Sequence, residues 1–127
     1  MNKRDYNQEL KDTADHKYAY NFDIDIMHPF MLRSFKPYFQ NDNVLELGSH
    51  KGEFTKRLIP YFNNITCVEA SDNAIKEAKN QLTDKVIFYN DIFEKVSLPK
   101  LYDNIILTHV LEHLGDPILL LRRINKE

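Results

Sequence analysis

Four short apolar runs are spaced along the chain from residue 44 onwards. They are Val44–Leu47, Ile65–Val68, Val86–Tyr89 and Asn104–Thr108. Each run has the length of a strand and is bounded by polar or turn-forming residues, which indicates a strand buried on both faces. We therefore predict four β-strands in this part of the chain.

Helical segments are predicted between and after these strands. Glu53–Phe62 follows the first strand and Ser71–Leu82 follows the second, where Ser71 or Asp72 can accept hydrogen bonds from the free amides of the first turn. A further helix is expected to open at Asp116-Pro117, because Pro is tolerated at the first helical position.

The N-terminal part has a different pattern. Residues 1–24 are polar and rich in Tyr without a clear period, whereas Asp25–Phe39 carries large apolar side chains near helical spacing. We predict a helical arm over residues 1–40 and an α/β domain over residues 41–127. In that domain the order strand, helix, strand, helix, strand, strand, helix implies parallel strands with helices on both faces of the sheet.

Charge and composition exclude several classes of partner. The net charge of −2 comes from 17 basic and 19 acidic residues that are mixed along the chain, so no basic stripe is available for nucleic acid or an anionic membrane. No apolar run approaches the length that spans a bilayer. The single Cys67 and an N-terminus without the apolar core of a secretory signal lead us to expect a soluble cytoplasmic protein.

The first predicted strand ends in a turn that contains two glycines, Gly48 and Gly52. In parallel sheets ligands bind at the carboxyl ends of the strands, and glycines let backbone amides approach a ligand closely. The Gly-x-x-x-Gly spacing differs from the Gly-x-Gly-x-x-Gly of dinucleotide sites and from the phosphate loop. This difference disfavours a nucleotide-dependent oxidoreductase, which would otherwise suit such a sheet.

Acidic residues follow the next two strands. Glu69 ends the second strand 21 residues after Gly48, where a carboxylate can accept hydrogen bonds from both hydroxyls of a ribose. Asp91 follows the third strand and can accept from an exocyclic amine such as that of adenine, while Ile92 offers an apolar face to the ring. The three strand ends together predict an adenosine site.

These residues resemble the motifs of class I S-adenosylmethionine-dependent methyltransferases. The similar segments are VLELG at 44–48 with Gly52, CVEAS at 67–71, NDI at 90–92 and the stretch 102–117, the last as in small-molecule methyltransferases that include quinone and sugar O-methyltransferases. The resemblance implies a Rossmann-like three-layer α/β/α sandwich with a mainly parallel sheet, and S-adenosylmethionine as cofactor. The departure is His50, where the family commonly has a second glycine, so the turn must accept a Cβ atom there.

The resemblance also implies a role for each matching residue. Glu46 and the Gly48–Gly52 turn would hold the methionine end of the cofactor, Glu69 the ribose, and Asp91 with Ile92 the adenine, while Thr108 and His109 would border the methyl group. The full set of implied cofactor-binding residues is Glu46, Gly48, Ser49, His50, Gly52, Glu69, Ala70, Asp91, Ile92 and Thr108.

Two histidines after the fourth strand are candidates for catalysis. His109 or His113 can take a proton from a substrate hydroxyl as a general base, although capping or packing would equally explain them. Glu112 lies beside them in the sequence, but helical spacing gives no fourth ligand, so we predict no metal site.

An aromatic group in the N-terminal segment has two interpretations. Tyr18, Tyr20 and Phe22 can form a lid across the cofactor or simply pack the helical arm.

We expect methyl transfer to an oxygen of a small molecule such as a sugar or quinone precursor. The family's sheet has seven strands and only four are predicted here, so the resemblance implies the first half of the domain, and a non-catalytic cofactor-binding or assembly module is the alternative. A fourth strand at the edge of the sheet, carrying Ile105, Ile106 and Leu107, would favour self-association.

Overall fold

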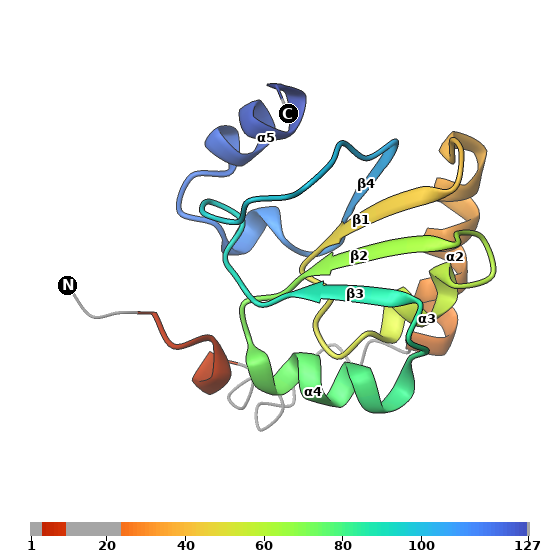
Figure 1. The fold of residues 1–127 in the computed structure, drawn as a ribbon, viewed down its shortest axis with the longest axis horizontal. Helices are drawn as coiled ribbons and strands as arrows, with labels where there is room; N and C mark the ends of the chain where they lie inside the picture. Colours follow the sequence, from red (N-terminus) through yellow and green to blue (C-terminus); the bar gives the residue numbers. More distant parts are fainter. Residues whose placement is uncertain (1–3, 10–23, 127) are drawn as a thin grey trace.

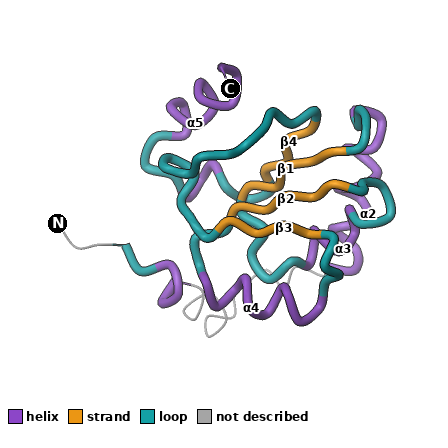
Figure 2. Tube along the Cα trace, in the orientation of Figure 1, coloured by secondary structure: helices purple, strands orange, loops and turns teal. Residues whose placement is uncertain are grey.

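The four predicted strands form one parallel sheet. The computed structural model describes residues 4–9 and 24–126. Its strands are β1 (Asn43–Leu47), β2 (Asn64–Val68), β3 (Val86–Tyr89) and β4 (Asn104–Leu107). They pair in the order β3-β2-β1-β4, and every pair is parallel (Figure 1). All four carboxyl ends therefore lie at the same edge of the sheet, where the chain leaves the strands as loops (Figure 2).

The predicted helices are present, and one is shorter than expected. Besides a helical turn at residues 6–9, the helical elements are α2 (Ile24–Phe35), η1 (Lys36–Tyr38), α3 (Glu53–Leu58), α4 (Asp72–Gln81), η2 (Leu111–His113) and α5 (Pro117–Lys126). The expectation that α3 would reach Phe62 is wrong. Pro60 has no amide hydrogen for the carbonyl of Lys56, and the chain turns instead with a bond from the amide of Tyr61 to the carbonyl of Leu58, 2.9 Å long.

Both predicted helix openings are confirmed by capping bonds. Ser71 has an extended backbone, and its Oγ accepts from the amide of Ala74 at 3.2 Å, so Ser71 rather than Asp72 caps α4. Asp116 Oδ1 accepts from the amide of Leu119 at 3.0 Å and caps α5. These bonds fix where each helix starts relative to the strand end before it.

One face of the sheet packs against α2, α3 and the end of α4. Its buried cluster consists of Val44, Phe54, Leu58, Phe62, Ile65, Cys67, Val86 and Ile106. Met31, Leu32 and Phe35 of α2 pack against this cluster. Other apolar residues of the same segment, Ile26, Phe30 and Tyr38, stay exposed, so only part of the predicted apolar pattern contributes to the core.

The opposite face packs against α5 and the segment between β3 and β4. Its buried cluster consists of Leu45, Leu47, Val68, Val96, Val110 and Leu120. Figure 1 shows α5 and α4 on opposite sides of the sheet. The chain is therefore the predicted three-layer α/β/α sandwich. Within the described ranges, no helix is long and apolar enough to cross a membrane.

Candidate functional site at the carboxyl edge of the sheet

The turn between β1 and α3 depends on its two glycines. Gly48 and Gly52 have φ angles of 79° and 82°, in the left-handed region that side chains rarely adopt. A Cβ atom on Gly48 would lie 2.7 Å from Cγ2 of Val110, and one on Gly52 would lie 2.8 Å from Cδ1 of Leu82. The two glycines thus let the turn pack closely against Val110, which precedes η2, and against Leu82 at the end of α4. The backbone of the turn stays open to a ligand.

His50 occupies the middle of this turn. Its φ of 53° is also left-handed, a conformation that histidine tolerates better than most residues. The turn therefore accepts the Cβ atom by placing His50 in the conformation that a glycine would take, and its side chain is exposed.

Glu69 connects this turn to the end of β2. Its Oε2 accepts from the backbone amide of His50 at 2.8 Å, and its Oε1 accepts from the backbone amide of Ser71 at 3.0 Å. Each carboxylate oxygen keeps a further lone pair, which suits two neighbouring hydroxyl donors. The structure thus brings together Glu69 and the glycine turn, which the sequence placed at separate strand ends.

Glu46 lies beneath the turn and is 1% exposed. Its Oε2 accepts from the hydroxyl of Thr55 and lies 3.7 Å from Sγ of Cys67. Burial raises the pKa of Glu46 from 4.5 to about 7, and the hydrogen bonds from Thr55 and Cys67 offset part of that rise. Burial, with the neighbouring carboxylate, also raises the pKa of the Cys67 thiol well above its usual value, so this thiol is unreactive.

Ser49 adds a polar group inside the turn. Its Oγ is buried, and its one neighbour that can bond to it among the described residues is the weakly hydrogen-bonding thiol of Cys67. Buried hydroxyl groups are usually paired, so this atom is suited to hold a polar group of a ligand.

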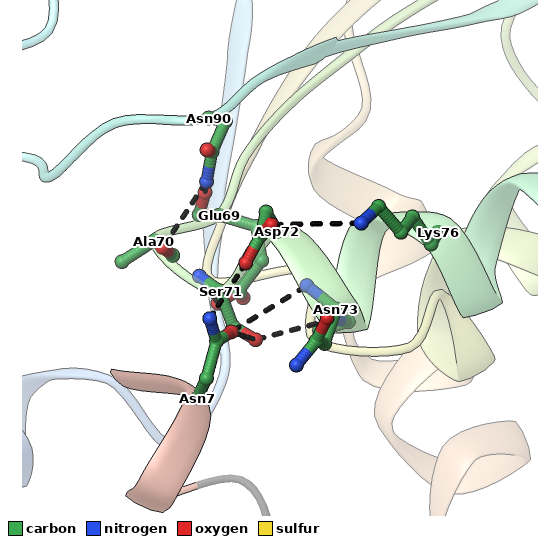
Figure 3. A network of polar contacts seen from close by, with 9 residues as sticks. Asn7, Glu69, Ala70, Ser71, Asp72, Asn73, Lys76 and Asn90 are labelled. Carbon is green, nitrogen blue, oxygen red and sulfur yellow. Dashed lines mark hydrogen bonds and ion pairs between the residues drawn. The ribbon is translucent and has the colours of Figure 1, made fainter. Parts of the chain in front are cut away.

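The end of β3 holds Asp91, a predicted site residue, and Asn90, which belongs to the same motif but was given no role. Asp91 is exposed, and its Oδ1 accepts from the amide of Ile92 at 2.8 Å. Asn90 donates from Nδ2 to the carbonyls of Glu69 and Ala70, at 3.0 and 3.1 Å, and so fixes the ends of β2 and β3 to each other (Figure 3). A donor residue directly after a strand was the available signal for Asn90.

The end of β4 brings the predicted histidines beside one carboxylate. Glu112 Oε1 lies 3.5 Å from Nδ1 of His109 and 4.0 Å from Nε2 of His113. The assumption of helical spacing was wrong, because His109 has a φ of 55° and precedes the short helix η2. All three side chains are more than half exposed, and Thr108 is half-buried before them. In the part of the chain that the structure describes, no three His, Cys, Asp or Glu residues are grouped to hold a metal.

Sequence reasoning also missed His28 on α2. Its ring packs edge-on against Phe54 of α3, with the ring centroids 5.2 Å apart, and its buried Nδ1 has no partner in the described segments. Burial and the nearby charge of Arg57 lower the pKa of His28. No sequence motif singles out this histidine. The proposed lid residues Tyr18, Tyr20 and Phe22 lie outside the described residues.

A cavity of about 510 Å³ lies elsewhere, under the sheet face that α5 covers. It is lined mainly by core residues such as Leu45, Leu98 and Ile124, and by none of the residues predicted for the site. Because its lining is mostly apolar and shares no residue with the strand ends, we do not assign it to the candidate site.

Comparison with solved structures supports this fold. N-methyltransferase NodS from Bradyrhizobium japonicum WM9, in complex with S-adenosyl-l-homocysteine, has a TM-score of 0.74 at 22% identity; the match covers 90% of this chain and 61% of NodS. An S-adenosylmethionine-dependent methyltransferase from Clostridium acetobutylicum ATCC 824 has a TM-score of 0.69 at 18% identity, covering 89% of this chain and 48% of that one. The chain thus spans about half to three fifths of the length of these similar structures.

Sequence comparison identifies the family. An uncharacterised methyltransferase of Geobacillus sp. (strain WCH70) is 35% identical over 74 residues, which is 58% of this chain and 35% of the relative. The family model described as a methyltransferase domain matches residues 16–126. Because this match covers most of the chain, the protein belongs to the methyltransferase domain family.

Proposed function

We propose that this chain binds S-adenosylmethionine at the carboxyl edge of its sheet and forms part of a methyltransferase. The observation that carries the proposal is the pair of bonds by which the amides of His50 and Ser71 hold the Glu69 carboxylate against the glycine turn. This arrangement leaves two acceptor oxygens side by side, as recognition of a ribose requires.

The surrounding residues fit the rest of such a cofactor. The turn formed by Gly48, Ser49 and Gly52 offers a close backbone approach and the buried Ser49 hydroxyl for the polar methionine end. Glu46 lies beneath it. On the other side of Glu69, Ala70, Asp91 and Ile92 border the position of the adenine, with the second oxygen of Asp91 suited to accept from its amino group.

The proposed reaction is the transfer of a methyl group to an acceptor. When bound, S-adenosylmethionine supplies a methyl group activated by its sulfonium. Thr108 and His109 follow β4 and border the methyl position in this proposal. His109 or His113 would take the proton from the hydroxyl group of an acceptor that receives this methyl group. Glu112, within 4.0 Å of both imidazoles, stabilises the protonated histidine.

We propose a small molecule with a hydroxyl acceptor, such as a sugar or quinone precursor. The support is the similarity of the segment 102–117 to small-molecule O-methyltransferases. Nitrogen is the competing acceptor atom, since the similar NodS is an N-methyltransferase. Assays with matched hydroxyl and amino acceptors distinguish the two.

The alternative function is a non-catalytic cofactor-binding or assembly module. It is favoured by the exposure of the histidine cluster, because His109, Glu112 and His113 are 58%, 53% and 65% exposed and so lack the dry environment that accelerates methyl transfer.

Calorimetric titration with S-adenosylhomocysteine tests the shared part of both functions. We expect binding by the wild type, a large loss of affinity in Glu69→Ala, and no change in Asp84→Ala, whose exposed carboxylate lies before β3 at the opposite edge of the sheet. Formation of S-adenosylhomocysteine from S-adenosylmethionine with an acceptor then separates the enzyme from the binding module. A folded wild-type chain that binds no S-adenosylhomocysteine contradicts both.

A further inference from the structure

The N-terminal segment 4–9 contacts the carboxyl edge of the sheet at two separate places. Arg4 donates from Nη1 to the carbonyl of His113 at 3.0 Å, and Asn7 contacts the start of α4. Arg4 is itself held by Glu9, with 2.6 Å between Nε and Oε1. The segment therefore joins the region after β4 to the region after β2, although more than 60 residues separate Asn7 from its partners on α4.

Asn7 uses both ends of its amide at the start of α4. Its Nδ2 donates to Oδ1 of Asp72 at 2.6 Å, and its Oδ1 accepts from the hydroxyl of Ser71 at 2.6 Å and from the amide of Asn73 at 3.5 Å. Figure 3 shows the Asn7 side chain reaching from the N-terminal segment to this helix start. The Asn7 side chain thus donates to one acceptor and accepts from two donors. Among neutral side chains, only the amides of Asn and Gln combine a donor and an acceptor in this form.

Ser71 connects Asn7 to Glu69, the candidate ribose acceptor. Ser71 is 2% exposed, and its backbone amide donates to Oε1 of Glu69 at 3.0 Å while its hydroxyl donates to Asn7. Asn7 and the Glu69 carboxylate are therefore connected through a single residue, by the side chain and the backbone amide of Ser71.

We propose that Asn7 is a positioning residue of the nucleoside site, which acts through Ser71 to hold the Glu69 carboxylate in place. This inference rests on the proposed function for its ligand, and on the hydrogen bonds of Asn7 and Ser71 for its geometry. The N-terminal segment is thereby part of the site and does more than pack beside it.

An exchange of donor and acceptor tests the proposal. Asn7→Asp keeps the acceptor for Ser71 but places a carboxylate against that of Asp72. We expect S-adenosylhomocysteine to bind about tenfold more weakly, because a good hydrogen bond is replaced by repulsion. Adding Asp72→Asn supplies the missing donor from the other side, and the double variant should return to within about threefold of wild type. Asn80→Ala, an exposed position later in α4, is the control and should leave affinity unchanged.

Hydrogen exchange without ligand provides a second, independent readout. The Ser71 amide, which donates to Glu69, should exchange faster in Asn7→Asp and slow again in the double variant. A wild-type chain that binds no S-adenosylhomocysteine would defeat the proposed function, but the exchange rates would still decide the positioning role. Unchanged affinity and exchange in Asn7→Asp, or a loss that Asp72→Asn does not restore, overturns the inference.

Discussion

At the level of single residues, Glu46 carries a carboxyl group that the fold keeps from water. Its pKa is raised from 4.5 to about 7 by burial, so the folded chain retains a proton that the unfolded chain releases. The contribution of Glu46 to the free energy of unfolding is therefore most favourable below pH 4.5. It declines as the pH rises from 4.5 to about 7 and stays constant above that. Since one pKa unit corresponds to about 1.4 kcal/mol, the decline is on the order of 3 kcal/mol.

Urea unfolding at pH 5 and pH 8 measures this effect. The wild type should lose stability between the two values, and Glu46→Gln, which cannot ionise, should lose much less. Glu94→Gln is the matched control, because Glu94 is exposed and should leave the pH dependence as in the wild type. An equal decline in all three proteins would show that Glu46 ionises freely in the folded state.

The glycine turn makes a second prediction about single residues. Gly52→Ala should lower the free energy of unfolding by about 2 kcal/mol, because its φ of 82° is left-handed and the new Cβ would lie 2.8 Å from Leu82. Gly115→Ala is the control, since nothing lies within 4 Å of a Cβ there. Thermal or urea unfolding of both variants checks the difference, and equal stabilities would contradict the described turn.

Residue types and spacing predicted much of the candidate site, but not its contacts. The pattern placed Glu69 and the glycine turn at adjacent strand ends, and the structure joins them through the amide of His50. The role of Asn7 was not predictable, because its partners lie more than 60 residues away in sequence and it belongs to no periodic pattern. Asn90 belongs to the segment 90–92 that resembles a family motif, but its bonds to the carbonyls of Glu69 and Ala70 were not predicted. The methyl-side roles of Thr108, His109 and His113 stay predictions.

At the level of elements, α2 packs against α3 through an aromatic contact at Phe54. Phe54 is 4% exposed and packs edge-on against His28 and Phe35 of α2, with centroid distances of 5.2 and 5.9 Å. Phe54→Ala should lower the free energy of unfolding by about 3–5 kcal/mol. Tyr38→Ala, at a position 79% exposed, should change it by less than about 0.5 kcal/mol. Similar losses in the two variants would contradict the packing of α2 against α3.

Periodicity located the elements better than their ends. Strands were predictable because buried parallel strands are continuous apolar runs, and helix starts because Ser71 and Asp116 provide caps. The early end of α3 follows from Pro60. The prediction gave more weight to the apolar pattern than to this proline and so extended the helix to Phe62. The division of the chain into an arm and a domain at residue 40 stays a prediction, although α2 packs directly against the first core cluster.

For the whole molecule, we predict self-association from two features of the described surface. β4 lies at the edge of the described sheet, and Ile118, Leu119 and Leu121 of α5 are 60%, 56% and 46% exposed. Unpaired strand edges and apolar patches bind other chains. The mean mass from light scattering should rise with concentration, and less so in Leu119→Lys, while Lys126→Ala serves as control. A monodisperse monomer at all concentrations would contradict this prediction.

The location of the nucleoside is the central claim about the molecule, and amide chemical shifts during titration with S-adenosylhomocysteine test it most directly. The largest changes should occur at Gly48–Gly52, Glu69–Ser71 and Asp91–Ile92, at the carboxyl edge of the sheet. Leu101 and Ile124, which line the cavity under α5, should change little. Shifts confined to that cavity, with none at the turn or at Glu69, would contradict the assignment of the site.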